Sequence, residues 1–175
     1  LENDYGAVNV DTMLLSDLES ERCGLESVSG ACDLDCHRRR FKTKLIALGM
    51  SGYDRVLIEP SGIFDIDEFF DALYDAPLDR WYEIGSVIAI VDANLDDALS
   101  DNSEFLLASQ IANAGAVVLS KVQNADDEQI DRTIAHLNRA MERFGCARRF
   151  DRGSVICKPW DALTDAELDG ITESG

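Results

Sequence analysis

Residues 53–62 read YDRVLIEPSG and carry the pattern that decides the fold class. The apolar run at 56–58 predicts a buried central strand of a parallel sheet, with Glu59 at its carboxyl end before a turn that contains Gly62. Open α/β sheets bind ligands at the carboxyl ends of their strands. A carboxylate there can hold magnesium through water, and a glycine amide can approach a phosphate closely because it has no side chain. A strand followed by an ordinary tight turn is the simpler interpretation of this segment.

The composition narrows the class of protein. With 175 residues, 46% of them hydrophobic, the chain can bury one core, and we expect a single domain over residues 1–175. The 34 acidic residues against 16 lysines and arginines give a net charge of −18, which disfavours nucleic-acid and anionic-membrane partners. The five cysteines are an odd number without a framework spacing, so we expect reduced thiols in a cytoplasmic protein.

Strand and helix patterns alternate along the rest of the chain. Besides 56–58, strands are expected at 86–92, 116–120 and 154–157, and helices around 41–48, 65–70, 103–114, 126–144 and 161–171. Thr164 is expected to cap the second half of the last helix. This alternation predicts a three-layer α/β fold, in which a mainly parallel sheet has helices on both faces.

Five motifs then occur in a fixed order. They are NDYG at 3–6 followed by Asp11, a cysteine-containing loop at 26–36, LIEPSG at 57–62, VDA at 91–93, and a Ser-Gln helix that leads into a strand and Lys121 over 109–121. In this order they resemble the CobW-like metal-associated GTPases, relatives of the hydrogenase and urease nickel-insertion GTPases. The resemblance extends over about residues 3–121 and implies a P-loop NTPase-like fold.

The resemblance also implies a function and a set of site residues. It implies a GTP-binding and GTP-hydrolysing metal chaperone or metal-insertion protein that uses GTP and Mg, binds Zn or a similar divalent metal, and serves a client metalloprotein. Glu59 would orient magnesium or the attacking water, and Gly62 would sense the terminal phosphate. The remaining nucleotide-binding residues implied are Asn3, Asp4 and Asp11 of a first switch loop, Ser61, Lys121 and Gln123.

Three departures from the family pattern are visible. The phosphate loop G-x-x-x-x-G-K-[ST] does not occur in these residues, and the resemblance places it just before Asn3, so we expect a domain that is N-terminally incomplete and lacks its first strand. The base-reading motif N-K-x-D is replaced by SKVQ at 120–123, and neutral Gln123 would accept hydrogen bonds from guanine more weakly than aspartate. The metal motif is C-x3-C rather than C-x-C-C. A sheet without its first strand exposes apolar surface, which a partner segment or a homodimer would cover.

The cysteine-containing loop gathers candidate metal ligands. Cys32, Cys36 and His37, with Cys23 upstream, offer four soft or borderline ligands that suit tetrahedral zinc. Three aspartates are candidate oxygen ligands or neighbours of the metal: Asp4, Asp33 and Asp35. The alternative is that these cysteines are small buried packing residues.

Other residues are expected to be structural. Cys146, Cys157 and Trp160 are interpreted as packing residues, and His136 as a solvated or satisfied surface group on the long helix. Asp92, at the end of its strand, either assists a nucleotide site or opens the next turn. Two functions therefore stay open: the GTP-dependent metal chaperone, and a non-enzymatic, degenerate or truncated member that acts as a metal-binding or partner-docking module.

Overall fold

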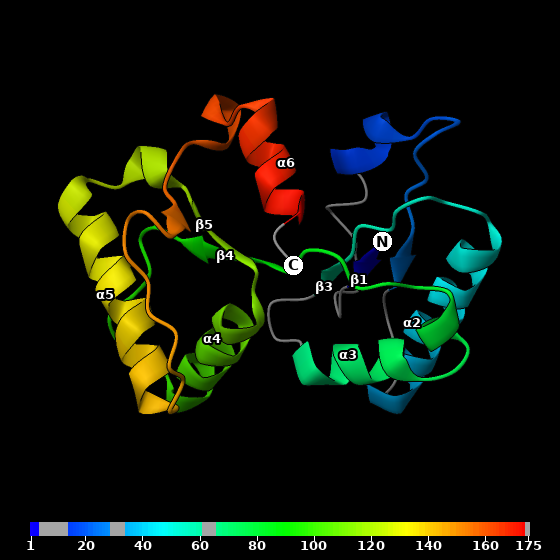
Figure 1. Ribbon diagram of the computed structural model, residues 1–175, viewed down its shortest axis with the longest axis horizontal. Coiled ribbons are helices and arrows are strands. Elements are labelled where there is room, and N and C mark those ends of the chain that lie inside the picture. The colour runs from blue at the N-terminus through cyan, green and yellow to red at the C-terminus, as the bar shows by residue number, and fades with distance from the viewer. Residues whose placement is uncertain (4–13, 29–33, 61–65, 174–175) are drawn as a thin grey trace. The chain divides into compact units, whose positions relative to one another are not determined.

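The computed structural model describes residues 1–3, 14–28, 34–60 and 66–173, and the chain divides into two compact units, Leu1–Glu83 and Ile84–Gly175 (Figure 1). Each unit contains a three-stranded parallel sheet with helices, which confirms the predicted α/β class. No helix in the described part of the chain combines the length and the apolar character needed to cross a bilayer.

The described residues of the first unit include short strands and the helices α2 and α3. Its sheet has the order β2-β1-β3, with all pairs parallel. The elements in chain order are β1 (Glu2–Asn3), η1 (Ser16–Leu18), β2 (Ser27–Val28), α2 (Leu34–Met50), β3 (Glu59–Pro60), α3 (Ile66–Tyr74) and η2 (Leu78–Arg80).

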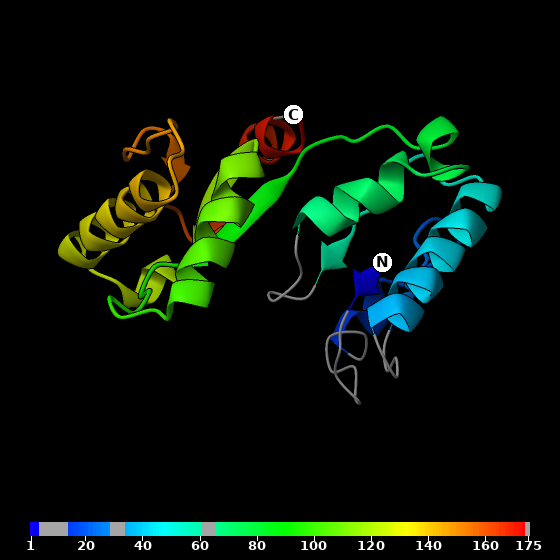
Figure 2. The same ribbon diagram turned by 90° about the horizontal axis from the view of Figure 1, so that it is seen from below.

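Helix α2 supplies most of the core of the first unit. Its residues His37, Phe41 and Leu45 recur every four positions and are buried, which places them on one face of the helix. The Phe41 ring lies 5.6 Å from the ring of Phe69 in α3, and Figure 2 shows these two helices side by side. The Tyr82 hydroxyl donates to the Leu45 carbonyl at 2.7 Å, so the end of this unit is fixed to the middle of α2.

The predicted buried strand at 56–58 is wrong in extent and burial. Strand β3 covers only Glu59–Pro60, both exposed, and Leu57 is 73% exposed. Beside it, the amino group of Leu1 donates to the Leu57 carbonyl at 2.5 Å, and the Leu1 carbonyl accepts from the Glu59 amide at 2.9 Å. An apolar run becomes a buried strand only where neighbouring elements pack over it. The composition of the run does not show whether they do.

The second unit has longer strands. Its sheet has the order β4-β5-β6, all parallel, and Asp92 at the end of β4 pairs in register with Ser120 at the end of β5. The elements are β4 (Ile88–Asp92), α4 (Asp101–Asn113), β5 (Ala116–Ser120), η3 (Val122–Asn124), α5 (Asp127–Arg143), β6 (Val155–Ile156), η4 (Trp160–Ala162) and α6 (Asp165–Glu173).

One face of this sheet carries the core of the second unit. Ala89, Val91, Val117, Leu119 and Val155 alternate along the strands and pack in one cluster with apolar residues of α4 and α5. The strand predicted at 86–92 is observed at Ile88–Asp92, and Ile88 and Ile90 on its other face are 40% and 71% exposed. Buried and exposed side chains therefore alternate along β4, although the residues at 88–91 are all apolar.

The helices of this unit begin at side-chain caps. Ser100 accepts from the Ser103 amide at the start of α4, and Asp126 accepts from the Gln129 amide at 2.7 Å at the start of α5. Thr164 and Glu167 form a reciprocal capping box at α6, which confirms the predicted cap. Hydrogen bonds from Lys158 and then Thr164 lower the pKa of Glu167 to about 2.

Two predictions about single residues in the second unit are wrong. His136 is 2% exposed and so is not a surface group, because the buried stripe of α5 is broad enough to include it. Its Nε2 does have a hydrogen-bond partner, the Glu104 carboxylate, which agrees with the satisfied alternative. Trp160 is 82% exposed rather than packed, because it lies in the short η4 turn. Cys146 and Cys157 do pack against the core cluster, as predicted.

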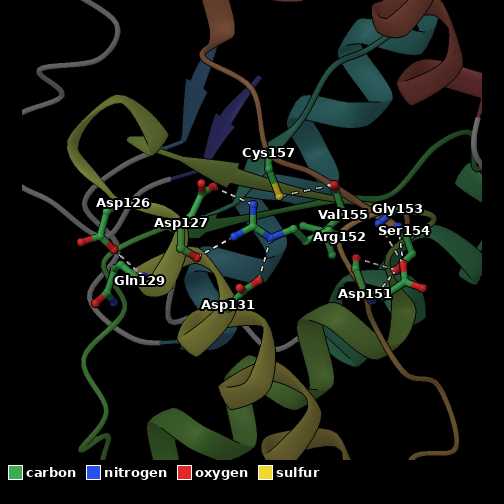
Figure 3. Close-up of polar contacts among 10 residues, drawn as sticks. All are labelled: Asp126, Asp127, Gln129, Asp131, Asp151, Arg152, Gly153, Ser154, Val155 and Cys157. Carbon is green, nitrogen blue, oxygen red and sulfur yellow. Dashed lines mark hydrogen bonds and ion pairs between the residues drawn. The ribbon is translucent and has the colours of Figure 1, made fainter.

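Arg152 connects the segment after α5 back to the first turns of that helix. Its guanidinium donates to the Asp131 carboxylate at 2.6 Å and to the Asp127 carboxylate at 2.7 Å, and also to the Asp127 carbonyl (Figure 3). The adjoining turn is closed by Asp151, whose carboxylate accepts from the amides of Gly153 and Ser154. The hydrogen bonds of the Arg152 guanidinium fix the turn that leads into β6.

Replacing Arg152 by alanine is expected to lower the free energy of unfolding at pH 7 and to have less effect in acid. The hydrogen bond from Arg152 lowers the pKa of Asp131 below its ordinary 3.8. The contribution of this ion pair is therefore complete above pH 3.8 and is lost as the pH falls through the lowered pKa. Urea unfolding across this range, with R152A compared with the wild type, measures the effect.

The control for this prediction is R132A, which removes an exposed arginine whose ion pair with Glu128 is longer, 3.5 Å. We expect R132A to have a smaller effect at every pH. A difference between R152A and the wild type that did not change with pH would contradict the assignment.

Candidate functional site

Two nucleotide-site candidates of the first unit, Asn3 and Glu59, lie on a pair of neighbouring strands. Glu59 lies in β3 with its side chain exposed, and β3 pairs with β1 so that Asn3 stands in register with Pro60. The backbone thus brings positions 3 and 59–60 together, although they are far apart in the chain. Asp4, Asp11, Ser61 and Gly62 lie outside the described residues.

An exposed carboxylate at this place suits a hydrated cation. Glu59 reaches solvent, and its backbone amide is fixed by the Leu1 carbonyl, so the carboxylate stands on an anchored segment. Magnesium is commonly bound by one or two carboxylates while keeping several of its waters. The described part of this site therefore fits a magnesium ion held through water.

The candidate metal ligands lie in different environments. Cys23 is exposed, and its backbone pairs with that of Ser20. Cys36 is half-buried in α2, and the His37 side chain is 0% exposed within the core of the first unit. Cys32 lies outside the described residues. Within residues 1–3, 14–28, 34–60 and 66–173, no three His, Cys, Asp or Glu side chains form a group that could hold a metal.

The second unit brings two charged side chains together at the carboxyl ends of its strands. The Lys121 ammonium donates to the Asp92 carboxylate at 2.6 Å, and the other oxygen of Asp92 accepts from the Asn94 amide at 2.9 Å. The hydrogen bond from Lys121 lowers the pKa of Asp92, so this carboxylate is charged at neutral pH. Asp92 thus opens the turn after β4, which is one of the two roles that the sequence left open, and its second carboxylate oxygen pairs with Lys121.

Lys121 has a strained backbone at this position. Its φ is +57°, in the left-handed region that residues with a Cβ seldom adopt. Val122 after it is buried against the core, and Gln123 is exposed in η3. Such strained residues cluster at functional sites, where the surrounding packing holds them.

The sequence analysis did not predict two side-chain contacts of the second unit, Asp92 with Lys121 and His136 with Glu104. Asp92 and Lys121 were each considered, but not as a pair, although two adjacent parallel strands that both end in polar residues are the signal for it. It also missed the hydrogen bond between His136 Nε2 and the Glu104 carboxylate, 2.6 Å long, which connects α5 to α4. The position of His136 beside the apolar stripe was the available signal.

Comparisons with known proteins agree with this arrangement of motifs. Residues 1–145 match the family model described as the CobW/HypB/UreG nucleotide-binding domain. The zinc chaperone YeiR of Escherichia coli (strain K12) is 27% identical over 147 residues, which cover 82% of this chain and 41% of that protein. The zinc chaperone YjiA of the same organism is 26% identical over 148 residues, which cover 79% of this chain and 45% of that protein.

The chain thus spans less than half the length of these two curated relatives. No solved structure matches it significantly.

Proposed function

Because the chain belongs to the CobW/HypB/UreG family of nucleotide-binding domains, we propose that it is part of a GTP-dependent zinc chaperone. The observation that carries this proposal is the family match over residues 1–145, joined to the names of two relatives that are both zinc chaperones. The exposed position of Glu59 and the charged pair at the end of β4 support it, because both lie where α/β sheets bind ligands.

In this proposal, the residues of the first unit handle the phosphates. Catalysis of phosphoryl transfer is mainly positioning and charge stabilisation, and magnesium supplies part of that charge. Glu59 would orient a magnesium-bound or attacking water from its exposed place on β3, and Gly62 would offer its amide to the terminal phosphate. Asn3, Asp4 and Asp11 would form the first switch loop, and Ser61 would lie beside the phosphates.

The residues after β5 are proposed to contact the base. Lys121 would lay its methylene stem along the ring, since its ammonium is already neutralised by Asp92. Gln123 would face the edge of the base as an amide, which offers one acceptor and one donor in place of the two acceptor oxygens of a carboxylate. We therefore expect weaker discrimination in favour of guanine than an aspartate would give.

Zinc is proposed as the cargo, held by Cys23, Cys32, Cys36 and His37. Cys36 and Cys23 carry thiol groups, which suit zinc once they are deprotonated. His37 is buried, so its participation requires the start of α2 to rearrange. Nucleotide-driven ordering of the adjacent switch loops is the kind of change that would provide this rearrangement.

A zinc titration of the intact protein tests the proposal. We expect a nonhydrolysable GTP analogue to change the zinc affinity at least about fivefold, which is the lower end of typical coupling between two sites. Isothermal titration calorimetry with and without the analogue measures the change. An affinity that the analogue leaves unaltered would count against coupled chaperone function.

Two cysteine variants serve as a matched pair in that experiment. C36S should weaken zinc binding, whereas C157S should not, because Cys157 packs against the core of the second unit. Equal zinc affinities of C36S and the wild type would remove Cys36 from the ligand set.

A binding module without hydrolysis is the second candidate, and the sequence SKVQ at 120–123 favours it. In that case the intact protein would bind zinc but release no phosphate from GTP. A phosphate-release assay on the intact protein separates the two candidates.

A further inference from the structure

The ion pair between Asp92 and Lys121 stands apart from the other ion pairs of the second unit. Both of its residues lie at the carboxyl ends of adjacent parallel strands, and Asp92 is in register with Ser120, the residue before Lys121. The side chains are 35% and 61% exposed, so the pair lies at the surface of the edge where ligands of α/β sheets bind.

Asp92 is held firmly on its own side of the pair. The carboxylate oxygen that does not contact Lys121 accepts from the Asn94 amide. The Ala93 amide donates to the Ser120 carbonyl at 2.9 Å, so the hydrogen bonding between β4 and β5 continues one residue beyond β4. The buried Thr133 hydroxyl donates to the Ala93 carbonyl at 2.8 Å and so connects this turn to α5. The carboxylate therefore has a position fixed by the sheet and by a core helix.

Lys121 has the opposite character. A lysine side chain is a flexible four-carbon stem with a compact charge at its end, so holding it in one conformation costs rotamer entropy. Its backbone is already committed to the left-handed region, with a φ of +57°. A fixed carboxylate at 2.6 Å from the ammonium confines the remaining freedom of this side chain.

We infer that Asp92 is a positioning residue for nucleotide binding, which holds the Lys121 side chain at the ligand-binding edge of β5. Asp92 itself touches no ligand in this role and acts through Lys121. The inference rests on the proposed nucleotide binding, and it adds a residue outside the set of residues to which that proposal assigns ligand contacts.

A double-mutant cycle with a ribose-labelled fluorescent GTP analogue tests this role in the intact protein. We expect K121A to weaken binding of the analogue about tenfold and D92A about three- to fivefold, within the range of partly exposed ion pairs and single contacts. The double variant should bind no more weakly than K121A, because Asp92 has nothing left to position. D92E should restore most of the affinity, since it keeps the charge.

The controls separate positioning from general damage. D101A breaks a 2.7 Å ion pair with Arg143 elsewhere on this unit and should leave the affinity unchanged. The lysine Nζ resonance of Lys121, followed by NMR without nucleotide, should move or broaden in D92A but not in D101A, which checks that D92A releases the ammonium. Rescue of the affinity by D92E is the readout that a merely structural role would not give.

Each outcome of this experiment either supports the inference or overturns it. Wild-type protein that does not bind the analogue overturns the proposed function and this inference with it. Wild-type protein that binds, with D92A equal to it or with additive effects in the cycle, overturns the inference alone. Non-additive loss with rescue by D92E supports it.

Discussion

Replacing Glu59 by glutamine is expected to slow GTP hydrolysis by the intact protein about 100-fold, the lower limit for removal of a group that handles protons or water in the transition state. The substitution keeps the shape of the side chain but removes its charge, so an ordered water or hydrated magnesium meets one neutral amide oxygen in place of a charged carboxylate. Because Glu59 is exposed, the fold should not change. Single-turnover phosphate release measures the rate, and circular dichroism checks the fold.

The matched control for this prediction is E83Q, which changes another exposed glutamate in the first unit. We expect E83Q to hydrolyse GTP at the wild-type rate. A rate for E59Q within threefold of the wild type would remove Glu59 from the catalytic set, whatever the zinc affinity.

Replacing Leu137 by alanine is expected to lower the free energy of unfolding of the second unit by about 3 kcal/mol, in the middle of the range for buried leucines. Leu137 is 0% exposed and belongs to the cluster that joins α5 to the sheet. Truncation removes its methyl groups from that cluster and leaves a cavity, because close-packed neighbours relax only in part. Urea denaturation followed by far-ultraviolet circular dichroism measures the loss.

L168A provides the comparison, because Leu168 is a leucine in a helix of the same unit but is 45% exposed. Its loss should stay below about 1 kcal/mol, as for other surface substitutions. Equal losses in the two variants would mean that the core of this unit is not centred on α5.

Sequence reasoning worked best where one local pattern was sufficient. The long helix was predicted at 126–144 and is observed at Asp127–Arg143, because its apolar spacing and its Asp126 cap act within a few residues. The strand at 116–120 is observed at Ala116–Ser120 for a similar reason. The ordered motifs also indicated the family to which the chain belongs.

The same reasoning failed where segments distant in the sequence determine whether a side chain is buried. Leu57 reads as a core residue by composition but is exposed, and His136 reads as polar surface but is buried against Glu104. Burial depends on which elements cover a face, and no short window of sequence contains that information.

The sequence by itself therefore determined the helices and strands with strong local signals, the acidic character of the chain and its family. Only the tertiary structure decided that Asp92 meets Lys121, that Arg152 reaches back to Asp127 and Asp131, and which side of β4 faces the core. The physical reason is that local conformation follows from interactions within a few residues. Contacts between charged ends of separate strands exist only after parallel pairing has set their register.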